Sequence, residues 1–180
     1  MSDPSQIELT SGASSAVSDS EYREVCEFLY REAAALDGHD YAAWMRMLAD
    51  DVSYYVGAPT VRAAGEAVRE YPIFSESAYQ LNKRIQQISN PKLTHAENPP
   101  SITRRFVTNI LVSRSIQSNE LEVMSNIMLH RSQGIEGETH IYTGGRSDVL
   151  RRRDGVLLLA RRRVKFDRPL VSSMNVSIPL

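Results

Sequence analysis

Apolar positions recur every three or four residues in the N-terminal part of the chain, which is the spacing of an amphipathic helix. Ser18 and Glu21 have the spacing of a capping box at its start, and Gly38 can take the left-handed conformation that ends a helix. The apolar stripe between these ends consists of Tyr22, Val25, Cys26, Leu29, Ala33 and Leu36. We therefore predict a first helix between Ser18 and Gly38.

A short helix and a strand are predicted next. Asp40 is a good N-cap residue, and the apolar residues after it are Tyr41, Trp44, Met45 and Leu48. Asp50 and Asp51 interrupt this pattern. The run 52–56, Val-Ser-Tyr-Tyr-Val, is rich in strand-forming residues, so we predict a strand that ends near Gly57.

The pattern over residues 60–74 is ambiguous. A third helix is predicted from Ser75 or Ser77 to about Ser89, and its apolar side is formed by Leu81, Ile85 and Ile88. The three prolines within residues 91–103 predict a loop.

From residue 104 onward, long segments alternate in the manner of β-strands. These segments are residues 105–114, 120–131, 140–153 and 156–168. The first carries apolar side chains on both faces, so we expect a central strand. Gly144 and Gly145 predict a β-bulge in the third, and residues 171–180 can add an edge strand.

Asp154-Gly155 is a strong signal for a two-residue hairpin turn. Such a turn pairs residue 153 with residue 156 and, counting away from the turn, residue 148 with residue 161. We therefore predict a cross-strand charge pair between Asp148 and Arg161.

Helices followed by a long antiparallel meander define an α+β fold. A strongly twisted sheet of this kind curls around helices packed on its concave face and so forms a cone. We expect a single domain over residues 19–180. Residues 1–18 are rich in Ser, Gly and acidic side chains and are expected to form a flexible tail.

The two halves of the chain carry opposite charge. Residues 1–90 have 7 basic and 14 acidic side chains (−7), and residues 91–180 have 14 and 8 (+6), although the whole chain carries only −1. The small net charge argues against binding to nucleic acid or to a membrane surface. The opposite charges either pair within the domain or meet another subunit.

Two arginine runs, residues 151–153 and 161–163, flank the predicted hairpin. Three consecutive arginines in a strand must point to both faces of the sheet. At least one face near the hairpin is therefore wet, ion-paired or part of an interface, and we predict that the hairpin contacts a neighbouring chain.

Cys26 is the only cysteine, which excludes an intrachain disulfide and favours a reducing compartment. Its place in the helical stripe is that of a small core residue. No apolar run is long enough to cross a membrane, and residues 1–20 lack the basic start and apolar stretch of a signal peptide. We expect a cytoplasmic protein.

The sequence contains no recognisable metal or nucleophile motif. The histidines are not spaced as metal ligands; they are His39, His95, His130 and His140. A Rieske cluster needs two Cys and two His, which one cysteine cannot supply. Neither a Gly-x-Ser-x-Gly elbow nor a phosphate loop is present. We expect no catalytic, cofactor-binding or metal-binding residue in this chain.

Acid–base chemistry stays open, because a cone with an apolar mouth can host proton transfer where a titratable group projects inward. The candidates are Asp37, His39, Tyr54, Tyr55, His130 and His140. Asp37 and Asp40 are more often helix-terminal residues. A stand-alone dehydratase or isomerase and a non-enzymatic ligand-binding protein are therefore alternatives.

Six short stretches, taken together and in order, are specific to one protein family. They are Leu29–Ala33 with Leu36 and Asp37; Tyr41, Trp44, Leu48, Asp51, Val52 and Tyr54; Ala96–Ser101 leading to Arg104–Ile110; Glu122–Asn126 to His130–Ser132; Gly145–Arg152; and Asn175–Leu180. This set resembles the small (β) subunit of aromatic-ring-hydroxylating dioxygenases of the Rieske non-haem iron class. The resemblance covers about residues 20–180 and departs locally at Gly38 and His39.

The resemblance implies a cystatin-like cone, akin to ketosteroid isomerase and scytalone dehydratase, in a hexamer of three α and three β subunits. It implies that the α subunit holds a Rieske [2Fe-2S] cluster and a mononuclear Fe(II), and adds both atoms of O2 to an aromatic hydrocarbon. Electrons from NAD(P)H arrive through a reductase, often by way of a ferredoxin. The β subunit holds no cofactor and is chiefly structural, and in some members it modulates substrate preference.

Overall fold

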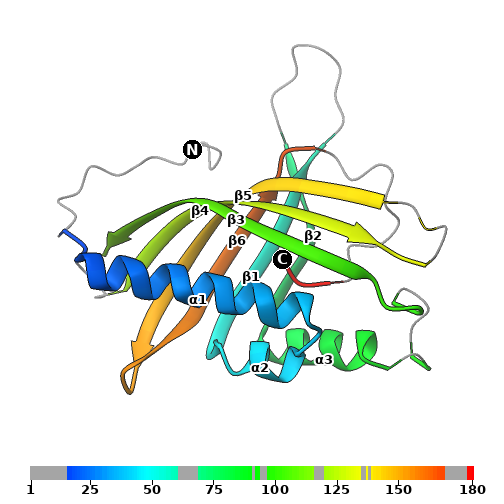
Figure 1. Cartoon of the computed structure of the whole chain (residues 1–180), viewed down its shortest axis with the longest axis horizontal. Coiled ribbons are helices and arrows are strands. Elements are labelled where there is room, and N and C mark those ends of the chain that lie inside the picture. The colour runs from blue at the N-terminus through cyan, green and yellow to red at the C-terminus, as the bar shows by residue number, and fades with distance from the viewer. Residues whose placement is uncertain are drawn as a thin grey trace, which may run out of the picture.

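The computed structural model describes residues 16–60, 69–90, 92–93, 97–115, 120–134, 137, 139–168 and 178–180. Three helices pack against one six-stranded sheet (Figure 1). The helices are α1 (Asp19–Asp37), α2 (Tyr41–Met45) and α3 (Ala78–Ile88). The strands are β1 (Leu48–Pro59), β2 (Glu70–Ser77), β3 (Ile102–Arg114), β4 (Leu121–Ser132), β5 (Thr139–Arg153) and β6 (Val156–Phe166).

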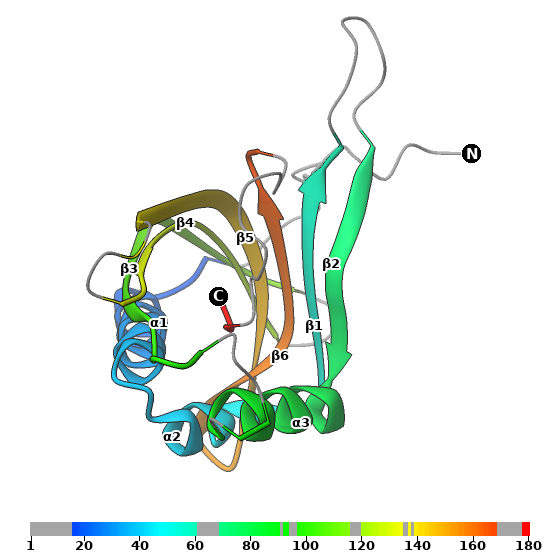
Figure 2. The same cartoon turned by 90° about the vertical axis from the view of Figure 1, so that its right-hand side faces the viewer.

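The strand order is β2-β1-β6-β5-β4-β3, in which β1 and β6 run parallel and the other neighbours run antiparallel. The sheet curls so that α1 lies along its concave side, while α2 and α3 close one end (Figure 2). The core fills this concave side and includes Trp44, Tyr54 and Leu159, all fully buried. The predicted α+β cone is confirmed.

Helix α1 begins with the predicted capping box, in which the Ser18 hydroxyl accepts from the Glu21 amide. Two residues of the predicted apolar stripe do not belong to the buried side of the helix, since Tyr22 is 43% exposed and Cys26 is only half-buried. The residues that the helix buries are Val25, Phe28, Leu29, Glu32 and Leu36. The buried stripe therefore contains a carboxylate, Glu32.

The end of α1 differs from the prediction. Gly38 has a φ of −84°, and its N–H continues the helical pattern by donating to the Ala34 carbonyl. The left-handed residue is the next one, His39, with a φ of 55°. Asp40 then caps α2 as predicted, because its side chain accepts from the Ala43 amide at 2.9 Å.

Strand β1 is longer than predicted and runs through Asp50 and Asp51, which do not break it. These two exposed carboxylates pair with Arg153 and Arg151 of β5 at 2.7 Å and 2.9 Å. Strand β2 was not predicted and occupies part of the ambiguous stretch and the residues after it. Helix α3 starts after Ser77, the second of the two start sites considered.

Strand β3 is an edge strand and not the central strand that its pattern predicted. The strand has apolar residues in both alternating sets because of a bulge at Asn109, where φ is 53° and the pairing with β4 shifts. The bulge reverses which alternate residues point inward. Val107 and Ile110 are therefore both buried, whereas Phe106 and Leu111 are both exposed.

The hairpin pairs Arg153 with Val156, as the Asp154-Gly155 turn predicts. The register then shifts between Val149 and Leu150, so Asp148 faces Arg162 and not Arg161. The predicted charge pair was therefore wrong by one residue. The shift moves it to the concave side of the sheet, where both partners are buried.

The bulge predicted at Gly144 and Gly145 is absent, since β5 keeps its register with both neighbours there. Gly144 instead allows the backbones of β5 and β6 to lie close together. A Cβ atom at this position would lie 2.4 Å from the main-chain oxygen of Lys165 on β6. The same atom at Gly145 would meet nothing within 4 Å.

Two predictions fall partly outside the described residues. The tail over residues 1–18 is described only from residue 16, and the strand over residues 171–180 only from residue 178. Ile178–Leu180 is not in a strand. None of the described helices is long and apolar enough to span a membrane.

We predict that Gly144→Ala lowers the free energy of unfolding by about 1–3 kcal/mol, the usual cost of forcing an extra methyl group into a packed site. Gly145→Ala is the matched control and should be neutral or slightly stabilising, because its methyl group has room. Urea unfolding of both variants, followed by circular dichroism, measures the difference. Equal stability of the two variants would contradict the close approach.

Candidate functional site

One arginine on each of four neighbouring strands points into the cone and is at most 7% exposed. These residues are Arg105 on β3, Arg131 on β4, Arg146 on β5 and Arg162 on β6. A buried charge is costly unless it is paired and hydrogen-bonded. The carboxylates that pair with them are Asp37, Glu97, Glu32 and Asp148.

Arg162 is fully buried and lies at the centre of this set. Its Nε and Nη2 donate to the two carboxylate oxygens of Asp148, both at 2.8 Å. Its Nη1 and Nη2 donate to the two carboxylate oxygens of Glu32 at 2.6 Å and 2.7 Å, and Nη1 also donates to the main-chain oxygen of Leu180 at 2.8 Å. All five N–H donors of the guanidinium are therefore used.

Arg146 balances the charge of this cluster. Its Nε lies 3.3 Å from Asp148, and its Nη1 lies 3.7 Å from Glu32. Glu32 also accepts from the indole N–H of Trp44 at 3.1 Å. We call Glu32, Arg146, Asp148 and Arg162 the central cluster; its formal charges cancel.

The electrostatics of the central cluster favour the charged forms of Glu32 and Arg162. Burial would raise the pKa of Glu32, but the attraction of Arg162 and Arg146 outweighs burial and holds the pKa below its usual value. Burial likewise opposes the charge on Arg162, yet Asp148 and Glu32 hold the pKa of Arg162 well above its usual value. Burial and the repulsion from Arg162 lower the pKa of Arg146.

Asp37 and Arg105 form a second cluster where α1 ends beside β3. The Asp37 carboxylate accepts from the Arg105 guanidinium at 2.5 Å, from the Arg105 amide at 2.9 Å and from the Thr103 hydroxyl at 3.0 Å. This carboxylate therefore has the contacts of a structural ion pair.

Tyr54 lies in the core of the cone. Its ring stacks on Phe74 with centroids 5.9 Å apart, and its hydroxyl donates to the main-chain oxygen of Leu180 and accepts from the Leu180 amide at 2.9 Å. Burial raises the pKa of Tyr54, so the phenol stays neutral. The hydroxyl is thus bonded in both directions.

The other candidates lie apart from one another. Tyr55 is on the outer face of β1, where the Arg163 guanidinium covers its ring at 4.4 Å. His39 is exposed in the loop after α1, and His130 occupies an outward position of β4. His140 lies on β5 beside Tyr142, with ring centroids 6.1 Å apart, and His95 is outside the described residues. The structure does not bring these groups together.

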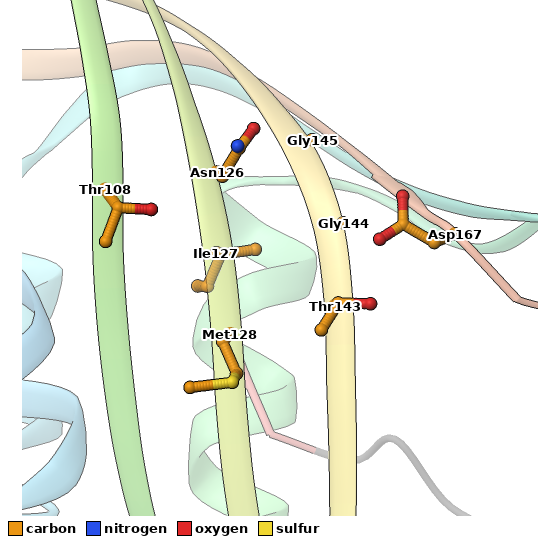
Figure 3. Close-up of a pocket in the computed structure, with 8 residues that line it drawn as sticks. All are labelled: Thr108, Asn126, Ile127, Met128, Thr143, Gly144, Gly145 and Asp167. Carbon is orange, nitrogen blue, oxygen red and sulfur yellow. The ribbon is translucent and has the colours of Figure 1, made fainter.

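The sheet has an outer hollow of about 370 Å³ over β3, β4 and β5 (Figure 3). Its lining includes Thr108, Asn126, Met128 and Asp167, which are exposed. A second hollow of about 240 Å³ lies beside Arg131 and His140. Within the described ranges, no three His, Cys, Asp or Glu side chains are grouped so that they could hold a metal ion.

The inward position of these arginines was not predicted from the sequence. The best available signal was the alternation on β5, where Arg146 and Asp148 share a face with Tyr142. A charged pair on an otherwise apolar face indicates a buried ion pair. The partner Glu32 also lies within the apolar stripe of α1, between Leu29 and Leu36.

The cone places the chain among proteins with a cystatin-like fold. A protein of unknown function with that fold, from Nostoc punctiforme, superposes with a TM-score of 0.56 at 13% identity, covering 87% of this chain and 100% of its own. The chain of a naphthalene 1,2-dioxygenase structure with indole in its active site superposes with a TM-score of 0.82 at 24% identity, covering 92% of this chain and 88% of its own.

The sequence defines the family. Residues 31–173 match the model of the ring hydroxylating beta subunit, and the chain belongs to this family. The β subunit of 3-phenylpropionate/cinnamic acid dioxygenase from Photorhabdus laumondii is 31% identical over 90% of this chain and 93% of its own length. The β subunit of biphenyl 2,3-dioxygenase from Rhodococcus jostii is 29% identical over 86% of each chain. The predicted resemblance is confirmed.

We predict that Glu32→Gln lowers the free energy of unfolding by about 3–5 kcal/mol at pH 7, because it leaves buried arginine charge without its partner. Glu27→Gln, an exposed position on the same helix, is the matched control and should change stability by less than about 0.5 kcal/mol. Since the folded-state pKa of Glu32 is lowered, its contribution is present above the unfolded-state pKa and is lost as the pH falls. Urea unfolding at pH 7 and at acidic pH should therefore show that the difference in unfolding free energy between wild type and Glu32→Gln becomes smaller as the pH falls. A difference that stays constant would contradict an ionised Glu32.

Proposed function

We propose that this chain is the structural, non-catalytic β subunit of the terminal oxygenase of an aromatic-ring-hydroxylating dioxygenase, and that it works in the cytoplasm. Membership of the β-subunit family carries the proposal. The interior of the cone supports it, since the titratable groups of the central cluster are paired with one another.

The proposal assigns the redox chemistry to the large α subunit. The α subunit holds the Rieske [2Fe-2S] cluster and the mononuclear Fe(II), three α and three β subunits form the complex, and a ferredoxin or reductase delivers electrons to it. This chain supplies no ligand to either iron centre. Its single cysteine and the absence of a three-residue ligand group in the described ranges support that division.

The outer face of the sheet is the surface that we assign to neighbouring subunits. It exposes apolar side chains on three adjacent strands, among them Phe106 at 47%, Met128 at 39% and Ile141 at 63%. Phe106 and Met128 are direct cross-strand neighbours. A contiguous apolar surface of this kind marks an interaction site more often than scattered single residues do.

The hairpin arginines fall into two groups, one paired within the chain and one exposed on the outer face. Arg151, Arg152 and Arg153 pair with carboxylates of the N-terminal half, so part of the opposite charge of the two halves is matched within the chain. Arg161 is exposed on the outer face of β6, beside Arg163. We therefore extend the proposed interface from the apolar strands to Arg161.

Purification tests the division of labour. The isolated chain is expected to contain less than one iron per ten chains and to show no turnover of aromatic substrates, because the proposal places both iron centres in the α subunit. Co-expression with the large subunit is expected to yield one complex that contains both chains, iron and activity. An isolated chain that binds iron stoichiometrically, or that turns over substrate, would refute the proposal.

Two substitutions test the interface. Phe106→Glu and Arg161→Ala are expected to weaken the complex at least tenfold, because each removes an exposed group from the outer face without touching the core. Tyr79→Glu on α3, which replaces a more exposed aromatic residue elsewhere, is the control and should leave the complex intact. Sedimentation velocity measures the assembly, and circular dichroism checks the fold. Unchanged sedimentation of both variants would rule out this face.

A further inference from the structure

The segment Ile178–Leu180 lies inside the cone, between α1 and the strands that surround it (Figure 2). Ile178 is 2% exposed and Leu180 is fully buried, and both belong to the main apolar core. The segment is not part of the sheet. It therefore fills space that the helices and the sheet leave inside the cone.

Side chains of three strands hold the main chain of this segment. Arg162 of β6 donates to the Leu180 oxygen at 2.8 Å, and Arg105 of β3 donates to the Pro179 oxygen at 2.6 Å. Tyr54 of β1 also donates to the Leu180 oxygen and accepts from the Leu180 amide. Side chains that hold main-chain groups in this way, with apolar side chains buried beside them, are the means by which a protein binds a separate peptide or carboxylate.

The two arginine donors are fixed independently of the segment. Arg162 is locked by two bidentate carboxylates, and Arg105 is held by Asp37. Both guanidinium groups would therefore keep their positions if Ile178–Leu180 were removed. The vacated space would be lined by apolar side chains and by three polar groups already aimed at it.

We propose that the cone contains a binding site for a small apolar group bearing a carbonyl or carboxylate oxygen, formed by Tyr54, Arg105 and Arg162, and that Ile178–Leu180 is its intramolecular ligand. Because the segment is tethered, its effective concentration is of the order of millimolar or higher, and a free ligand of modest affinity does not displace it. The interior is thus closed by the chain itself. This inference concerns the interior alone and stands whether or not the chain is a dioxygenase subunit.

The test uses the chain shortened to end at Ser177, with two probes: the peptide acetyl-Ile-Pro-Leu and 4-methylpentanoate. The shortened chain is expected to melt at least 5 °C below the full chain, and millimolar acetyl-Ile-Pro-Leu is expected to restore at least half of that loss. The full chain should show no shift with either probe. A shift with 4-methylpentanoate as well would assign the site to small carboxylates in general, and a shift with the peptide alone would assign it to peptides.

Two controls make the result specific. Acetyl-Ile-Pro-Gly lacks the isobutyl group of Leu180 and should bind at least tenfold more weakly, and Tyr54→Phe in the shortened chain should weaken acetyl-Ile-Pro-Leu at least fivefold. If the shortened chain is unfolded, the same titrations are followed by circular dichroism, and acetyl-Ile-Pro-Leu is expected to restore the folded signal. An unchanged melting temperature after shortening, no response to either probe, or equal binding of the two peptides would overturn the proposal.

Discussion

The ion pairs of Arg162 with Glu32 and Asp148 are the interaction on which the rest of the structure depends. Glu32 comes from α1 and Asp148 from β5, so one guanidinium on β6 joins the helix to the sheet. Desolvating these charges is costly, and only complete pairing offsets the cost. The register shift in the hairpin, which turns Asp148 and Arg162 to face each other on the concave side, is therefore a condition of the fold.

This arrangement determines what the inside of the cone can do. A general acid or base needs a free oxygen or nitrogen that faces a ligand, whereas the carboxylates of the central cluster already accept hydrogen bonds from arginine and tryptophan. The segment Ile178–Leu180 occupies further donors. The outer face of the sheet, in contrast, exposes apolar side chains on three adjacent strands. These contacts fit the proposed role of this chain, in which the interior stabilises the protein and the outer face binds partner subunits.

The sequence predicted what depends on local spacing, and it failed where distant strands decide. The capping box at Ser18, the cap at Asp40 and the Asp154-Gly155 turn follow from side-chain chemistry within a few residues. The bulge at Asn109 and the register shift after Val149 change which face each later residue occupies, and neither has a local signal. Counting alternate positions from a turn therefore placed Asp148 opposite Arg161. The register shift also hid the inward position of Arg162, whereas the alternation on β5 already places Arg146 and Asp148 on one face.

We propose that the interior contributes stability and no chemistry. The most direct measurement is the turnover number of the reconstituted oxygenase that carries Glu32→Gln in this chain, expressed per fully assembled complex and per bound iron. The account predicts the wild-type turnover number in that assembled fraction, even though the variant chain unfolds more easily. A turnover number at least tenfold lower, with assembly and iron content unchanged, would show that the interior takes part in the reaction.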